Sequence, residues 1–154
     1  MRTAFAILAL IAPAAALAAG PEAVQLTSKV SVEHVRKGAD GQPHKVVEEA
    51  KRVVPGEVVI LEFSYRNAGA KPATGFVITD PLPANVAFAG GETPGAVYSV
   101  DHGKSWGPLA SLRVPTANGG ARAATSTDVN AIRWAFPAIA PGGTGKVSFR
   151  GLVK

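Results

Sequence analysis

The fold is decided by the stretch from Val53 to Val86, which reads VVPGEVVILEFSYRNAGAKPATGFVITDPLPANV. The pair Pro55-Gly56 is typical of a tight turn. Apolar and polar residues then alternate over Val58–Arg66, which predicts a strand with one buried face. Asn67 and Gly69 tolerate a positive φ, so we expect them to end this strand.

The second half of the stretch predicts a change of sheet. Phe76–Ile78 has the composition of a short strand. Asp80 and Pro81 follow it, and Pro83 comes soon after. Two prolines remove two backbone donors, so this segment is not expected to stay in a central ladder. We expect the chain to cross here to another sheet and to resume pairing at Val86–Phe88.

The rest of the chain repeats this pattern of short strands and turns. Strand-like alternation or composition recurs at 24–35, 46–54, 97–100, 112–114, 131–136 and 146–153. The first two of these segments flank a Gly-Ala-Asp-Gly turn and are expected to form a hairpin. No later segment has a helical period over ten residues. The sequence therefore predicts an all-β, immunoglobulin-like β-sandwich of about seven to nine strands.

The first residues resemble a secretory signal peptide. Arg2 is followed by an apolar run from Ala4 to Ala12 and by the small residues Ala16-Leu17-Ala18. The run is shorter than the roughly 20 residues that a membrane-spanning helix needs. We expect cleavage after Ala18, a single domain over residues 19–154, and no transmembrane anchor once the signal is removed. The expected location is the periplasm or the cell surface.

Composition limits the classes of partner. The chain has no cysteine, so an exported domain of this kind must be stable without disulfides. The formal charge is +5 over 154 residues. Such a charge is compatible with an anionic surface polymer, although ordinary solubilising charge on strand faces explains it more simply. We expect no nucleic-acid partner, because no dense basic stripe is present.

The order of the turn motifs resembles a known family. It is similar to the "conserved repeat domain" of bacterial surface proteins, also called domain of unknown function eleven, over roughly Val53 to Val153. The residues that carry the resemblance are Val54-Pro55-Gly56-Glu57-Val58, Tyr65-Arg66-Asn67-Ala68-Gly69, Pro72-Ala73-Thr74, Thr79-Asp80-Pro81-Leu82-Pro83, Ile132-Arg133-Trp134 and Ile139-Ala140-Pro141-Gly142-Gly143. The resemblance implies an immunoglobulin-like module of the cell envelope that acts as a spacer or adhesive unit, without catalytic residues. Family members often occur as tandem copies, whereas one copy is present here.

A second motif lies at Ser99–Trp106, which reads SVDHGKSW and fits the Asp-box pattern of a β-hairpin turn. In this pattern Asp101 caps backbone donors, the glycine allows a positive φ, and the aromatic ring packs under the turn. The motif resembles those of secreted glycan-active proteins, where it is a structural element. Asp101 and Trp106 are therefore candidates either for bracing the turn or for contacting a glycan.

No set of residues suggests catalysis, a cofactor or a metal. The three histidines, His34, His44 and His102, have no partner at metal-ligand spacing. Glu48 and Glu49 are neighbours on a predicted strand and point to opposite faces. We therefore expect no enzyme, no cofactor and no metal site.

Two functions remain open from the sequence. The first is an exported, non-catalytic envelope module that contacts a protein or a surface polymer, or pairs the edge strands of two copies. For edge pairing, the long strand near the N-terminus is the expected element. The second is a glycan-binding or glycan-processing protein that uses the Asp-box hairpin and Trp106.

Overall fold

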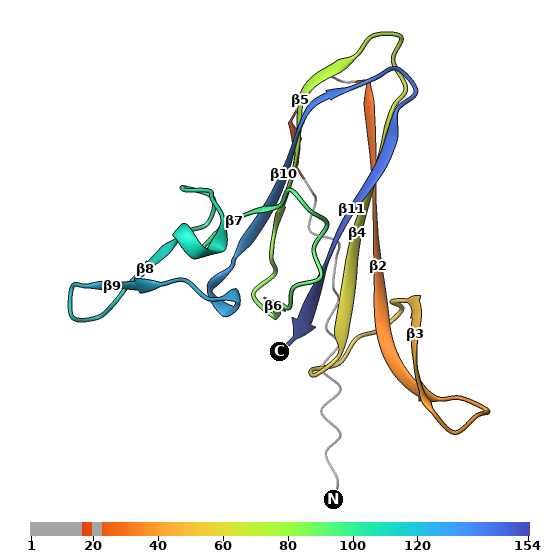
Figure 1. Cartoon of the computed structure of the whole chain (residues 1–154), viewed down its shortest axis with the longest axis vertical. Coiled ribbons are helices and arrows are strands. Elements are labelled where there is room, and N and C mark those ends of the chain that lie inside the picture. The colour runs from red at the N-terminus through yellow and green to blue at the C-terminus, as the bar shows by residue number, and fades with distance from the viewer. Residues whose placement is uncertain (1–16, 20–22) are drawn as a thin grey trace, which may run out of the picture.

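The protein is an all-β sandwich, described by a computed structural model over residues 17–19 and 23–154. A four-stranded sheet has the order β1-β5-β10-β7, and a five-stranded sheet has the order β3-β2-β4-β11-β6. The two sheets lie face to face, and a two-stranded arm projects from one side (Figure 1). None of the helices within the described residues is long and apolar enough to cross a membrane.

The strands follow one another with short connections. Their bounds are β1 (Leu17–Ala19), β2 (Val24–Lys37), β3 (Pro43–Glu49), β4 (Val58–Asn67), β5 (Ala73–Pro81), β6 (Val86–Phe88), β7 (Val97–Ser99), β8 (Arg113–Pro115), β9 (Ala121–Ala123), β10 (Ala131–Ile139) and β11 (Thr144–Val153). Most of the predicted signal peptide, residues 1–18, lies outside the described residues and stays a prediction. The last two residues before the predicted cleavage point are in β1, which pairs with β5.

The core lies between the two sheets, and its largest side chains come from four strands. β4 and β11 contribute Phe63 and Phe149, and β5 and β10 contribute Phe76 and Trp134, all at most 2% exposed. The Trp134 indole nitrogen also donates to the carbonyl of Thr93 at 3.0 Å. Alternation of buried and exposed residues along these strands confirms the predicted sandwich.

The predicted turn at Pro55-Gly56 is confirmed. Gly56 has a φ of +93°, which glycine adopts without strain, and Glu57 N donates to Val54 O at 3.2 Å. The Glu57 carboxylate also accepts from Val54 N at 2.8 Å. This turn sets the start of β4.

The predicted reason for the end of β4 is wrong. Neither Asn67 nor Gly69 has a positive φ. Instead, the Asn67 side chain is fully buried and donates to the carbonyls of Lys71 (2.8 Å) and Ile139 (2.9 Å). Its oxygen accepts from Gly69 N at 3.0 Å. One amide therefore ties the β4–β5 loop to the end of β10.

The crossing between sheets begins later than predicted. β5 continues through Asp80 and Pro81, which lie opposite Ile132 and Ala131 of β10. The chain then passes Pro83 and enters the other sheet at β6. The two prolines do not prevent pairing at Asp80, whose side chain is fully buried and accepts no hydrogen bond from any described residue.

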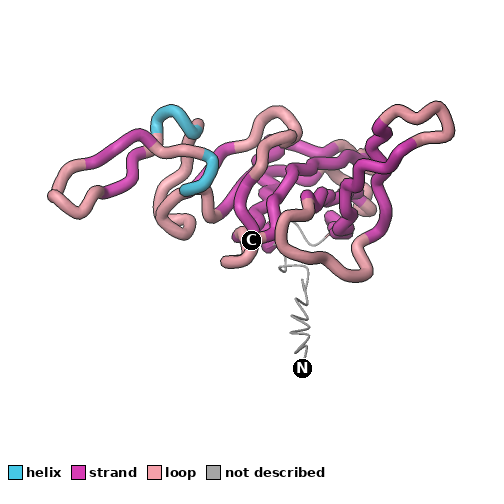
Figure 2. The backbone as a smooth tube through the Cα atoms, turned by 90° about the horizontal axis from the view of Figure 1, so that it is seen from below, coloured by secondary structure: helices cyan, strands magenta, loops and turns pink. Residues whose placement is uncertain are grey.

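Two extensions project beyond the sandwich. The predicted β2–β3 hairpin forms, with Lys37 opposite Pro43 at its tip. Its second strand was predicted at 46–54 but begins and ends earlier, at Pro43–Glu49. In the β8–β9 arm, β8 corresponds to the strand predicted at 112–114, whereas β9 and its pairing with β8 were not predicted, because the segment from Thr116 to Asp128 has little to bury. Two short 3-10 helices, η1 (Leu109–Ser111) and η2 (Ser126–Asp128), lie at the base of this arm (Figure 2).

The long N-terminal strand, β2, was expected to offer an edge for pairing. β3 pairs with residues 31–37 of β2 and forms the edge beside that half. Residues 24–29 of β2 pair with β4 and with no other described strand, so this half of β2 is itself an edge. Its expected role in pairing between copies stays a prediction.

Candidate interaction face

A shallow depression lies on the outer surface of the five-stranded sheet. Register places Gln25 of β2, Arg66 of β4 and Thr144 of β11 side by side in one row. Opposite residues of antiparallel strands point to the same face, so these three side chains share the outer surface.

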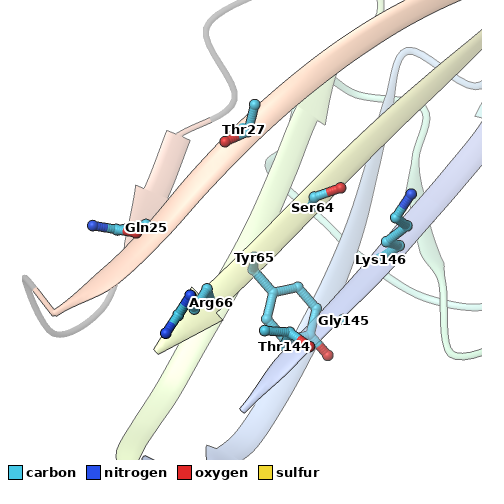
Figure 3. A pocket seen from close by; sticks show the side chains of 8 residues that line it. All are labelled: Gln25, Thr27, Ser64, Tyr65, Arg66, Thr144, Gly145 and Lys146. Atoms are coloured by element: carbon cyan, nitrogen blue, oxygen red, sulfur yellow. The ribbon is translucent and has the colours of Figure 1, made fainter. Parts of the chain in front are cut away.

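A second row lies two residues along the same strands. It contains Thr27, Ser64 and Lys146, again from β2, β4 and β11. We call the six outward side chains of the two rows the polar face (Figure 3).

The floor of the depression is backbone. Tyr65 and Gly145 lie opposite each other between the two rows. The Tyr65 ring packs inside the sandwich, 4.6 Å from the Phe136 ring centroid to centroid. A Cβ at position 145 would collide with that ring, so glycine is required there. The resulting depression has a volume of about 350 Å³.

The polar face is cationic. Arg66 is exposed, and no carboxylate of a described residue lies within ion-pair distance of it. Lys146 is 65% exposed and forms an ion pair with Glu62 at 3.0 Å. None of the residues that line the depression is acidic. The arrangement offers two cations, three hydroxyls and an amide to a ligand lying across three strands.

A charged cluster lies at the other end of the same outer surface. Glu33 accepts from Lys45 at 2.8 Å and from Arg150 at 3.3 Å. These two cations, Lys45 foremost, lower the pKa of the Glu33 carboxyl. The cluster connects the β2–β3 hairpin to β11.

The Asp-box residues form a braced turn. Asp101 accepts from the Ser99 hydroxyl (2.8 Å), the Ser105 amide (2.9 Å) and the Ser105 hydroxyl (2.6 Å). Hydrogen bonds from Ser105 above all, and then from Ser99, keep the pKa of Asp101 well below its usual range. Gly103 has a φ of +85°. Both Asp101 oxygens are therefore engaged within the loop.

Trp106 lies under this turn and is half-buried. Its ring nitrogen donates to Gly103 O at 3.0 Å, and the Arg133 guanidinium carbon lies 3.8 Å from the ring centroid. Arg133 is itself held by a hydrogen bond from its Nε to the Thr79 hydroxyl at 3.1 Å. Since Arg133 covers one face of the indole, only the other face is left for stacking on a sugar.

Replacing Asp101 with alanine is expected to open the Asp-box turn without unfolding the sandwich. The amide of Ser105 loses its acceptor, so its hydrogen exchange should accelerate by at least tenfold. Exchange of the Val147 amide in β11 should stay unchanged. Amide exchange followed by NMR measures both, and equal acceleration at the two positions would contradict a local role.

The histidines and the glutamate pair that the sequence analysis set aside have the following places in the structure. His44 contacts Asp40 at 2.9 Å in the hairpin turn, and His34 lies 3.7 Å from Glu57. Within residues 17–19 and 23–154, no three His, Asp or Glu side chains gather closely enough to hold a metal ion. Glu48 and Glu49 are successive residues of β3.

The sequence did not indicate the polar face. Its six residues come from three strands and are separated by up to 121 positions (Gln25 to Lys146), and each looks like an ordinary solvent-facing residue. Alternation within each strand identifies outward residues, whereas their alignment depends on register between strands.

A comparison with models of protein families matches no family, and searches of curated proteins and of solved structures find no match.

Proposed function

We propose that this chain is an exported, non-catalytic module of the cell envelope that binds an anionic surface polymer across the polar face. The observation that carries the proposal is the depression over Tyr65 and Gly145, which is lined by Arg66 and Lys146 and by no carboxylate. The formal charge of the full chain is +5, and removal of residues 1–18 with Arg2 leaves about +4, which agrees with an anionic partner.

The geometry suits an extended ligand. The two rows run across three hydrogen-bonded strands, which lie about 4.8 Å apart. Arg66 presents a planar set of donors suited to carboxylate or phosphate, and the neighbouring Thr144 hydroxyl and Gln25 amide add hydrogen bonds. Binding of this kind requires no movement of the backbone and no chemical step.

Export to the envelope rests on two features of the sequence. They are the signal-like residues 1–18 and the resemblance of Val53–Val153 to the conserved repeat domain of bacterial surface proteins. Production of the full chain with a C-terminal label, followed by fractionation and mass spectrometry of the N-terminus, tests this part. A chain that keeps residues 1–18 and stays inside the cell would contradict it.

Polymer binding is tested with poly(glycerol phosphate) and polygalacturonate as probes and neutral dextran as the reference. The double variant Arg66→Ala/Lys146→Ala is expected to weaken binding to the anionic probes by about tenfold or more, because two charge-assisted contacts are lost. Binding should also weaken as salt is raised.

The matched control is Lys37→Ala/Lys104→Ala, which removes the same net charge at exposed positions outside the polar face. The control should keep most of the affinity. If both double variants lose affinity equally, the effect belongs to net charge, and the polar face is not the binding site. If neither anionic probe binds to the unaltered protein, the proposal fails.

A second proposal is glycan binding at the Asp-box hairpin. Its support is the half-buried Trp106, one of whose faces is not covered by Arg133. Trp106→Ala on an array of neutral glycans tests it, with the polar-face variant as the reference. Retention of all binding by Trp106→Ala would exclude this hairpin as a glycan site.

A further inference from the structure

The β3 edge of the five-stranded sheet has a defined hydrogen-bonding pattern. Ala50 N donates to Val30 O at 3.0 Å, which marks this opposed pair as hydrogen-bonded. Bonded and non-bonded pairs alternate along an antiparallel ladder. The backbone groups of Lys45, Val47 and Glu49 therefore point away from β2, toward the open edge of β3.

The side chains of the same three residues share one face. They lie opposite Val35, Glu33 and Ser31 of β2, which face the outer surface. Val47 is 53% exposed. A strand edge that offers free backbone groups and an exposed β-branched residue is a template for another strand. Among the described residues, no strand other than β2 pairs with β3.

We propose that the strand that covers this edge is β3 of a second copy of the chain, paired antiparallel about a two-fold axis through Val47. In this register Val47 of one copy lies opposite Val47 of the other. On either side of this central pair, Lys45 of one copy lies opposite Glu49 of the other. Each of the three residue pairs exchanges two backbone hydrogen bonds. Unlike charges lie opposite each other, and the two exposed valines cover one another.

The neighbouring registers are less favourable. The two-fold axis is perpendicular to the sheet, so the outer surfaces of the two copies lie on the same side. Two residues that lie opposite each other across the dimer must therefore belong to the same surface of the sheet. A register centred on Lys45 would place two lysines together. A register centred on Val46 would place Glu49 opposite Pro43, which has no N–H to donate.

The side chain of Lys45 is already directed over this face. Its ammonium donates to Glu33 at 2.8 Å and remains 67% exposed. An ammonium has three donors, so further donors remain for Glu49 of the second copy. Glu49 is exposed and forms no ion pair with any described residue.

The dimer is independent of polymer binding, and either proposal can fail alone. If both hold, the two polar faces lie on the same side of one continuous sheet. A polymer then meets two binding faces at once, which raises its apparent affinity through effective concentration.

Single cysteines test the register directly, since the chain has none of its own. Opposite Cα atoms of a hydrogen-bonded pair lie about 5.5 Å apart, within the range that a disulfide spans. Val47→Cys should therefore form a covalent dimer at least tenfold faster than Val35→Cys, a control residue of the same hairpin that is 67% exposed. Equal rates would overturn the proposal, as would sedimentation showing only monomer at about 1 mM.

Charge exchange provides a second test. Lys45→Glu and Glu49→Lys each place like charges opposite each other, so each should raise the dimer dissociation constant about tenfold. An equimolar mixture of the two variants restores unlike pairs and should dimerise at least as tightly as the unaltered protein. Lys37→Glu, at the hairpin tip, should have no effect. A mixture that remains monomeric would overturn the proposed register.

Discussion

Asp80→Asn is expected to stabilise the protein by up to about 4 kcal/mol at pH 8 and to change its stability little at pH 3. The Asp80 side chain is fully buried, and neither carboxyl oxygen has a hydrogen-bond partner among the described residues. Burial raises the pKa of this carboxyl from its ordinary value of 3.8 to about 7. A pKa raised from 3.8 to about 7 means that folding disfavours the ionised carboxyl, relative to the protonated one, by about 4 kcal/mol.

The sign follows from proton linkage. Below about pH 4 Asp80 is neutral in both the folded and the unfolded chain, so its full contribution to stability is present. Between the ordinary pKa of 3.8 and the raised pKa of about 7 the unfolded chain ionises first, so the contribution of Asp80 to stability falls as pH rises. Above pH 7 the folded state bears the whole cost of a buried charge.

Urea unfolding at pH 3, 5.5 and 8 measures this effect. The difference in unfolding free energy between Asp80→Asn and the unaltered protein should grow across this series. For Glu49→Gln, which removes an exposed carboxyl, the difference in unfolding free energy from the unaltered protein should be the same at all three pH values. A difference that stays constant with pH would show that Asp80 does not titrate as a buried acid.

Asn67→Ala is expected to destabilise the protein by on the order of 4 kcal/mol. The substitution removes two donors and one acceptor, and leaves the carbonyls of Lys71 and Ile139 and the amide of Gly69 without their partner. Each buried polar group that loses its partner costs about 1–3 kcal/mol. The loss is a large part of the 5–15 kcal/mol that stabilises a typical domain.

Chemical denaturation at pH 5 gives the magnitude, with Asn118→Ala as the reference. Asn118 is an exposed amide in the loop of the β8–β9 arm, where it accepts from Gly120 N and the Thr116 hydroxyl. Its loss should cost less than about 1 kcal/mol. If the two variants are equally stable, Asn67 does not hold the loop and β10 together.

The elements that local signals determine were predicted well. Period-two alternation gave β4 and β10, and the turn composition gave the β2–β3 hairpin and Pro55-Gly56. These signals work because each strand buries one face and each turn needs residues with particular backbone preferences.

Features that depend on distant partners were not predicted. The end of β4 depends on Ile139, 72 positions away from Asn67, so its true cause was not visible in the sequence. Asp80 resembled a turn residue, because aspartate followed by proline is common in turns; its burial is a consequence of packing between the sheets. The polar face depends on the register of three strands, which alternation alone does not fix.

The order of strands in the larger sheet also determines how the domain would respond to mechanical load. β2 and β11 run parallel to each other on either side of β4, so Val24 and Val153 lie at opposite ends of the sheet. A pull between these two points acts along the strands and loads both ladders in shear. All the bonds between β4 and its neighbours then share the force together, whereas peeling would break them one at a time. A chain tethered at both ends would therefore transmit tension through its sheet with little extension.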